Sequence, residues 1–332
     1  NHCFKINNGF IRNGHNVCSF SDRDMSRMNL FNKLNNNKSL NEALIQTFKN
    51  FSPNLVVLGH ADKIHINTLN EFRAINKNIK IIEWSVDNYF LDNTENKFKA
   101  RSSVIDAFFI TNADQNIKSC LGKSNSISFF PNIFDKSIES MKIFEKSEYS
   151  YDIFYALSFG VGTGKLKSIK SDYDREIYLD LISNEYPEIK TNFFGYNGIQ
   201  PVWGHSFENE LAKSPISLNL SRKPYLKYYS SDRISQYLGN GSCVFVDINS
   251  KLDDLFNKEE VIFYDSNDHV DFGKKVLKMV ENINSAKEVA KKGWNRGHIN
   301  YNEKIITNYF LDIAFNKKPT REYSWPIHQY FQ

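Results

Sequence analysis

The sequence predicts two α/β domains, each a Rossmann-like parallel sheet covered by helices. Short apolar segments of strand length alternate with helical patterns along the chain, which is typical of parallel sheets that are buried on both faces. The alternation stops at a polar stretch near 135–150 and then starts again. The length of 332 residues also fits two domains of ~100–200 residues each.

The first half opens on a helical pattern. The apolar residues of 4–11 fit a helix that stops at Gly14, and a short strand follows over 16–20. Because an α/β domain that starts with a helix is unusual, we expect that the first strand of this domain lies upstream and is missing here. The next strands are expected over 55–59, 79–86, 106–111 and 127–131, with helices between them over 40–51 and 68–76.

The second half repeats the alternation without a sequence repeat. Strands are expected over 151–159, 190–195, 215–221, 242–247 and 260–265, and helices over 176–186, 232–241, 272–294 and 300–315. The predicted domains are an acceptor-side domain over 1–137, a linker over 138–150, a nucleotide-sugar domain over 151–305, and a helix end with tail over 306–332. We expect this tail to return to the first domain.

Composition excludes several classes of protein. The 42 Lys and Arg are interleaved with 38 Asp and Glu, and the net charge is only +4, which argues against a nucleic-acid surface. The cysteines are too widely spaced for a metal site or a disulfide framework, and we expect free thiols; they are Cys3, Cys18, Cys120 and Cys243.

Localisation is predicted from two further absences in the sequence. No apolar run reaches the ~18 residues of a membrane span, and no signal peptide is visible. We therefore expect a cytoplasmic protein without a transmembrane segment. Contact with the inner face of the membrane stays an alternative for the tail, which carries Arg321, Tyr323 and Trp325.

Polar residues follow the predicted strands of the first half. Four strand ends in series carry a carboxylate within about three residues, and one adds a histidine; the carboxylates are Asp24, Asp62, Asp87 and Asp114, and the histidine is His60. Helix capping would explain any single Asp. Since ligands of open parallel sheets bind beyond the carboxyl ends of the strands, the set indicates a polar wall that binds the acceptor.

Glycine, lysine and tyrosine, rather than carboxylates, follow the first predicted strands of the second half. Gly160, Gly162 and Gly164 lie in a loop with Lys165 and Lys167, where the backbone can approach a phosphate closely. Neither a P-loop nor a G-x-G-x-x-G pattern is matched, so a plain flexible turn is the alternative. Tyr196 follows another strand and can stack on a base or simply pack.

The segment 218–241 carries the strongest signal. A strand ends at Ser221, and the basic residues Arg222, Lys223 and Lys227 follow. The sequence Ser230-Ser231-Asp232-Arg233 then opens a helix, whose free amides and positive dipole end would favour an anion. Arg233 in the first helical turn is unfavourable for the dipole, and a bound phosphate would offset this. A capped surface helix is the alternative.

This segment resembles the GT-B glycosyltransferases, specifically the spore-maturation (CgeB-like) group of the family 1-type clan. The stretch KYYSSDRISQYLGNGSCVFVD is similar to their R-x-x-E-x-x-x-x-G helix, with Arg233, Gln236 and Gly241 on the pattern. The resemblance implies a donor held mainly by the second domain, an acceptor held mainly by the first, and no obligatory metal or other cofactor. The Glu of the pattern, which commonly binds the donor ribose, is Gln236 here, so the donor nucleotide is not assigned.

The expected function is transfer of a sugar from a nucleotide-sugar to a glycan or lipid-linked glycan, in bacterial surface polysaccharide synthesis. Arg233, Lys227 and the amides after Ser230 and Ser231 would stabilise the departing diphosphate. His60 is the first choice of base, with Asp62, Asp87 and Asp24 as rivals. The expected donor-binding residues are Gly160, Tyr196, Arg222, Lys227, Ser230, Ser231, Asp232, Arg233 and Gln236.

Three other functions stay open at this point. A metal-dependent GT-A transferase would use a D-x-D pattern, which Asp22-Arg23-Asp24 and Asp172-Tyr173-Asp174 both match. A non-catalytic nucleotide- or sugar-binding protein would have the same two-domain shape. A nucleotide-dependent epimerase of GT-B shape would release free sugar without an acceptor.

Overall fold

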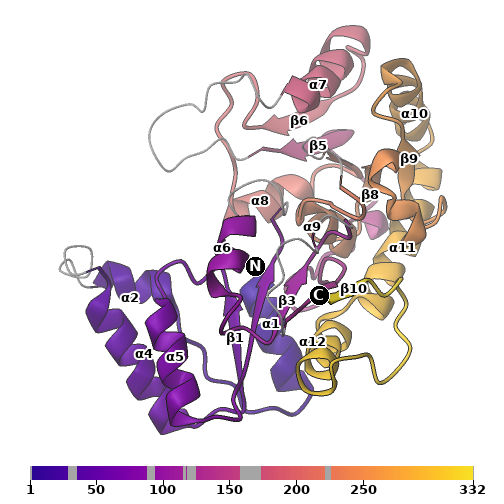
Figure 1. Cartoon of the computed structure of the whole chain (residues 1–332). Helices are drawn as coiled ribbons and strands as arrows, with labels where there is room; N and C mark the ends of the chain where they lie inside the picture. Colours follow the sequence, from indigo (N-terminus) through magenta and orange to yellow (C-terminus); the bar gives the residue numbers. More distant parts are fainter. Residues whose placement is uncertain are drawn as a thin grey trace. The chain divides into compact units, whose positions relative to one another are not determined.

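The computed structural model describes residues 2–28, 36–87, 94–114, 117, 125–157, 173–220 and 226–331. The chain divides into two compact units, each with its own sheet (Figure 1). The first unit comprises Asn1–Pro131, Glu303–Tyr323 and Ile327–Gln332, and the second comprises Asn132–Asn302 and Ser324–Pro326. The predicted fold class, α/β with two parallel-dominated sheets covered by helices, is confirmed.

The first sheet has the strand order β1-β2-β3-β4-β10. Its strands are β1 (Leu55–Gly59), β2 (Lys80–Ser85), β3 (Ala107–Ile110), β4 (Ser126–Phe129) and β10 (Gln329–Phe331). The first four are parallel, while β10 runs antiparallel to β4. β3 and β4 are buried throughout and β2 over five of its six residues. The wholly apolar sequence of β3 is typical of a parallel strand that is covered on both faces. β1 lies at an edge and is mostly half-buried.

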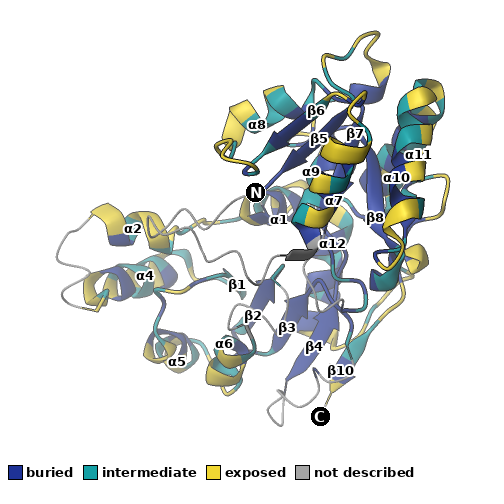
Figure 2. Cartoon of the chain, turned by 90° about the horizontal axis from the view of Figure 1, so that it is seen from above, coloured by how far each residue is buried: buried dark blue, intermediate teal, exposed yellow. Residues whose placement is uncertain are grey.

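Helices cover both faces of the first sheet (Figures 1 and 2). They are α1 (His2–Arg12), α2 (Asp22–Met28), α4 (Lys38–Phe51), α5 (Ile66–Ile75), α6 (Thr94–Arg101) and α12 (Glu303–Leu311), which continues into a π-helical turn, η6 (Asp312–Asn316). α1 packs closely on α12, because a Cβ on Gly9 would lie 2.3 Å from the Glu303 carbonyl oxygen. The strand predicted over 16–20 is wrong: these residues belong to no strand or bridge.

The second sheet is parallel throughout, with the order β6-β5-β7-β8-β9. Its strands are β5 (Ile153–Ala156), β6 (Thr191–Phe194), β7 (Ile216–Asn219), β8 (Cys243–Asp247) and β9 (Ile262–Tyr264). The chain leaves β5 for β6 on one side and then returns to β7 on the other. The sheet therefore has a topological switch point between β5 and β7, where ligands of such folds bind.

The helices of the second unit follow the predicted pattern, except that the helix over 204–211 was not predicted and that the long helix predicted over 272–294 is broken in two. They are α7 (Tyr173–Glu185), α8 (Gly204–Leu211), α9 (Arg233–Gly239), α10 (His269–Glu281) and α11 (Ile283–Asn300). Asn282 separates α10 from α11, and its side chain caps α11 by accepting a hydrogen bond from the Ser285 amide. The polar stretch before β5 belongs to this unit, since Ile143 and Phe144 are buried in it.

Candidate functional site

The switch point of the second sheet is spanned by Arg233, the first residue of α9. Its Nη2 donates to the carbonyl oxygen of Leu220, directly after β7, at 2.7 Å, and its Nη1 donates to that of Ala156, the last residue of β5, at 3.4 Å. The guanidinium also lies 5.3 Å from the centre of the Tyr155 ring. The side chain thus joins the carboxyl ends of two neighbouring strands.

The positive charge of Arg233 has no carboxylate partner in the described part of the chain. No ion pair within 4 Å involves it there, and its buried Nε has no hydrogen-bond partner among the same residues. Its contacts are neutral carbonyl oxygens and an aromatic ring. A partly buried cation in this state favours an anionic ligand, because hydrogen bonds between charged groups are the strong ones.

A buried amide, next in sequence to a residue that Arg233 contacts, donates to a buried hydroxyl. Asn219, the last residue of β7, donates from Nδ2 to the Ser230 hydroxyl at 2.7 Å, and both residues are buried. Asn132 donates to the Ser230 carbonyl oxygen at 3.3 Å. Asn219 and Asn132 were not predicted. An Asn inside the buried run ISLN was the available signal, because a buried polar side chain requires a partner.

α9 is shorter than predicted, and the amides at its start already have hydrogen-bond partners. The helix has seven residues, and the amides of Ile234 and Ser235 already donate to the carbonyl oxygens of Ser231 and Asp232. Gln236 donates from Nε2 to the Asp232 carboxylate at 3.3 Å. The amides of this first turn therefore donate to carbonyl oxygens of the same turn. The charge of Arg233 thus contributes more to anion binding at this site than the helix end does.

Other predicted donor residues have partners elsewhere in the unit. Lys227 lies 3.9 Å from Asp254 and 4.8 Å from the centre of the Tyr228 ring. The Tyr196 hydroxyl donates to Asp180, and burial together with this carboxylate raises the pKa of Tyr196 to about 12. Gly160 and Arg222 lie outside the described residues, as do the rest of the glycine loop and Asp172 of the second D-x-D pattern.

The first sheet brings His60 and Asp87 together at its carboxyl edge. His60 follows β1 and Asp87 follows the neighbouring β2, and Nδ1 of the imidazole lies 3.9 Å from the Asp87 carboxylate. The His60 ring packs edge-on against Trp84, with 5.9 Å between ring centres. His60 and Ala61 have φ angles of 57° and 34°, and such backbone strain concentrates at functional sites.

The remaining predicted acceptor carboxylates are engaged in other contacts. Asp62 pairs with Lys97 at 2.8 Å and with Arg23 at 3.0 Å. Burial raises the pKa of Asp62, but these two cations outweigh it and the pKa is lowered. Asp24 lies in the first turn of α2, where its carboxylate accepts from the Ser21 hydroxyl.

A buried ion pair supports the loop that carries His60. Arg101 of α6 donates to the Glu83 carboxylate of β2 at 2.7 Å and, through Nη2, to the Ala61 carbonyl oxygen at 2.6 Å. Burial raises the pKa of Glu83 to about 7 against the opposing effect of Arg101. This pair was not predicted, although an acidic residue inside the apolar run IIEWS was a visible signal.

The described residues contain neither a cluster suited to a metal ion nor a helix suited to a membrane. Across the described ranges, no group of three or more His, Cys, Asp or Glu side chains is arranged to hold a metal ion. The Asp22 carboxylate of the first D-x-D pattern accepts from the Lys63 amide instead. None of the described helices combines the length and apolar character needed to cross a bilayer.

A family of proteins described as glycosyl transferase-like matches residues 166–307. The matched part includes α9 with Arg233 and Gln236. It covers less than half of the chain, and it supports a glycosyl-transferring enzyme. No curated protein matches the sequence.

Solved structures with the same fold are glycosyltransferases. TarM superposes with a TM-score of 0.56 at 10% identity, over 82% of this chain and 57% of its own. HepE of Anabaena, in complex with UDP-glucose, gives 0.50 at 10% identity, over 84% and 82%. A trehalose-6-phosphate synthase, studied for glycosyl transfer with retention, gives 0.53 at 9% identity, over 85% and 78%. The likenesses show that the chain has the GT-B fold, and it spans little more than half of TarM.

Proposed function

We propose that this protein transfers a glycosyl group from a nucleotide-sugar to a glycan acceptor, with the donor diphosphate bound at Arg233. The observation that carries the proposal is the place of this cation. It spans the switch point between β5 and β7 and is paired with no carboxylate among the described residues. The glycosyl transferase-like match over 166–307 supports the proposal independently.

Stabilisation of the leaving group is the role proposed for Arg233. Negative charge grows on the nucleoside diphosphate as the glycosidic bond breaks, and a fixed cation in a partly buried site stabilises it without reorganising. The hydrogen bonds to Leu220 and Ala156 fix the guanidinium in place. We propose that this electrostatic contribution replaces an obligatory metal, and that Lys227, Ser230, Ser231 and Gln236 complete the donor site.

Deprotonation of the acceptor hydroxyl is the role proposed for His60. Nδ1 of its imidazole lies 3.9 Å from the Asp87 carboxylate, which is too far for a hydrogen bond but near enough for the carboxylate to orient the ring electrostatically. Asp62 fits this role less well, because Lys97 and Arg23 already neutralise it. We propose a glycan or lipid-linked glycan of a bacterial surface polysaccharide as the acceptor, with the reaction in the cytoplasm or at the inner membrane face.

Donor binding is the part of the proposal that can be tested most directly. Solved structures of HepE hold UDP and UDP-glucose, so UDP is the first nucleotide to try, followed by GDP and CMP. A nucleoside diphosphate that binds only the folded protein raises its melting temperature. The proposal expects one nucleotide to do so in the wild type and not in Arg233→Ala, with EDTA present throughout.

Assays of product formation distinguish a glycosyltransferase from an epimerase and from a binding protein. A panel of nucleotide-sugars with oligosaccharide acceptors should give a longer glycan in the presence of EDTA. Release of free sugar without acceptor would identify an epimerase, and nucleotide binding without any product would identify a binding protein. Product that appears only when a divalent cation is added back would overturn the metal-independent mechanism.

A further inference from the structure

The backbone turns sharply at His60, directly after β1. The Ala61 amide donates to the Gly59 carbonyl oxygen at 2.7 Å, so the three residues form a γ-turn centred on His60. The φ angle of His60 is 57° and that of Ala61 is 34°. A positive φ at the centre is the mark of the classic γ-turn, which is rare and strained. Since neither of these two residues is a glycine, contacts with the surrounding structure must hold the strain.

Trp84 of the neighbouring strand β2 packs directly against the start of this turn. A Cβ on Gly59 would lie 2.3 Å from Cζ2 of the Trp84 ring. The same ring meets the His60 imidazole edge-on, with 5.9 Å between ring centres. This contact fixes the place where the turn begins, while the carbonyl groups at its end require hydrogen-bond donors.

Arg101 of α6 supplies those donors. Its Nη2 donates to the carbonyl oxygen of Ala61 at 2.6 Å and to that of Ile64 at 3.3 Å, while its Nη1 donates to the Glu83 carboxylate at 2.7 Å. The side chains of this ion pair are only 11% and 3% exposed. The rigid fork of a guanidinium reaches carboxylate and carbonyl groups at once. Arg101 therefore ties the residue that follows His60 to the buried part of β2.

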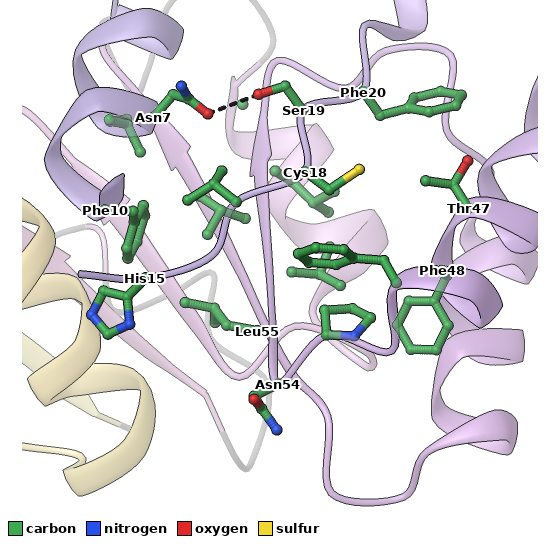
Figure 3. Close-up of a pocket in the computed structure, with 18 of the residues that line it drawn as sticks. Asn7, Phe10, His15, Cys18, Ser19, Phe20, Thr47, Phe48, Asn54 and Leu55 are labelled. Atoms are coloured by element: carbon green, nitrogen blue, oxygen red, sulfur yellow. Dashed lines mark hydrogen bonds between the residues drawn. The ribbon is translucent and has the colours of Figure 1, made fainter. Parts of the chain in front are cut away.

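Apolar packing around this loop is incomplete. Gly59, Ala61 and Ile64 line a cavity of about 840 Å³ beside β1 (Figure 3). Atoms that line such a space have no packing partners across it. Packing therefore holds the loop less firmly than a segment of the core, and the directional hydrogen bonds of Arg101 contribute more to its conformation.

We propose that Arg101 is a positioning residue for His60, on which it acts by holding the Ala61 carbonyl oxygen and so fixing the strained γ-turn. The inference rests on the proposed role of His60 as the base in glycosyl transfer. A turn released at Ala61 would relax toward ordinary φ values and move the imidazole from its place 3.9 Å from Asp87. A misplacement of about 1 Å can cost about 10²-fold in rate.

The test variant has to remove the hydrogen bonds of Arg101 without leaving a buried charge alone. Loss of Arg101 by itself would leave the Glu83 carboxylate buried without its cation, which destabilises a fold strongly. Arg101→Met/Glu83→Gln removes both charges together. The matched control is Arg73→Met/Asp106→Asn, because Arg73 of α5 also pairs with a carboxylate and binds two carbonyl oxygens, at the opposite edge of the same sheet.

Hydrogen exchange measures the turn without reference to activity. The amides of Ala61 and Ile64 both donate to carbonyl oxygens within this loop. Relative to the amides of β3, they should exchange about tenfold or more faster in Arg101→Met/Glu83→Gln than in the wild type. In the control variant their relative exchange should be that of the wild type. Unchanged exchange of these two amides in the test variant would overturn the proposal.

Turnover shows whether the turn matters for the reaction. The assay uses the nucleotide-sugar and oligosaccharide that give product in the panel described above. In the test variant kcat should fall about tenfold or more with an unchanged KM for the donor, whereas the control variant should keep the wild-type kcat. Full activity of the test variant would overturn the positioning role, even if exchange of the turn is faster.

The dependence on His60 is tested by combining the changes. Because Arg101 acts through His60, Arg101→Met/Glu83→Gln should cause no further loss of kcat in a His60→Ala background. A further loss there would show that Arg101 acts by another route and would contradict the proposal. A wild-type kcat in His60→Ala alone would remove the proposed base, and with it the role of Arg101, whatever the exchange of the turn shows.

Discussion

Arg101 and Glu83 form an ion pair of 2.7 Å between α6 and β2, and Glu83 is only 2% exposed. The second nitrogen of Arg101 holds the Ala61 carbonyl oxygen, directly after His60. The pair therefore links the interior of the first unit to the loop that carries the proposed base. Its energetics are open to measurement because Glu83 titrates in an unusual range.

The stability contributed by Glu83 should fall as the pH rises toward neutrality. Burial raises its pKa from 4.5 to about 7 in the folded state, so the folded protein holds this proton more tightly than the unfolded chain. The contribution is complete below pH 4.5 and is lost as the pH rises through 7, by at most about 3 kcal/mol. Glu83→Gln cannot titrate and provides the reference.

Urea denaturation at pH 5, 6, 7 and 8 measures this effect. The free energy of unfolding of the wild type, minus that of Glu83→Gln, should decrease across the series. An increase would mean that attraction to Arg101 exceeds the cost of burial and that the native carboxylate stays ionised.

Gly195 and Gly198 should differ sharply in their tolerance of alanine. Both have positive φ, 73° and 78°, and both lie in the turn after β6. A Cβ on Gly195 would lie 1.9 Å from the Leu157 carbonyl oxygen, whereas one on Gly198 meets nothing within 4 Å. Gly198→Ala should cost about 1 kcal/mol from backbone strain alone. Gly195→Ala should cost at least about 2 kcal/mol more, and similar melting temperatures for the two variants would refute the close contact.

Arg233→Ala should abolish most transfer activity. Removal of one group that stabilises developing charge costs about 10²–10³ in kcat. Arg233→Lys keeps the charge but cannot span Leu220 and Ala156, so it should recover only part of the rate. Lys292→Ala removes a surface cation that pairs with Glu259 and should leave kcat unchanged. Circular dichroism and melting temperature must be checked alongside, since the same side chain ties β5 to β7.

His60→Ala should lower kcat more than it raises KM for the donor, because the proposed base acts on the acceptor. Proton abstraction by a positioned side chain contributes typically 10²–10⁴-fold. Asp87→Asn should lower kcat less than His60→Ala does, and Asp62→Asn should be close to wild type. A kcat in His60→Ala close to that of the wild type would exclude this histidine as the base.

The sequence predicts most of the architecture because apolar runs and helical periods are local signals. The strands β1 to β9 all lie at or within one to three residues of their predicted ranges. β10 was not predicted, because its three residues QYF are too few to show an alternation of polar and apolar side chains, and the strand depends on β4 for pairing. The segment 16–20 was predicted as a strand because its composition suits one, but a strand also needs a partner, and composition does not show partners.

The candidate site was predicted less completely for the same physical reason. Arg233, Gln236 and Ser230 were visible because they lie in one segment. Their contacts with Ala156, Leu220, Asn219 and Asn132 join residues that are far apart in the chain. The short α9 and its self-satisfied first turn also depend on local geometry that residue types do not specify.

The discontinuity of the first unit has a consequence for biosynthesis. Its sheet is completed by β10, and α1 packs on α12, so residues from both ends of the chain must meet. Nearly all of the second unit, 132–302, is translated before α12 or β10 emerges from the ribosome. Because domains fold as units during synthesis, we expect the second unit to reach its native state first, while the first unit can complete its packing only after α12 and β10 have been made.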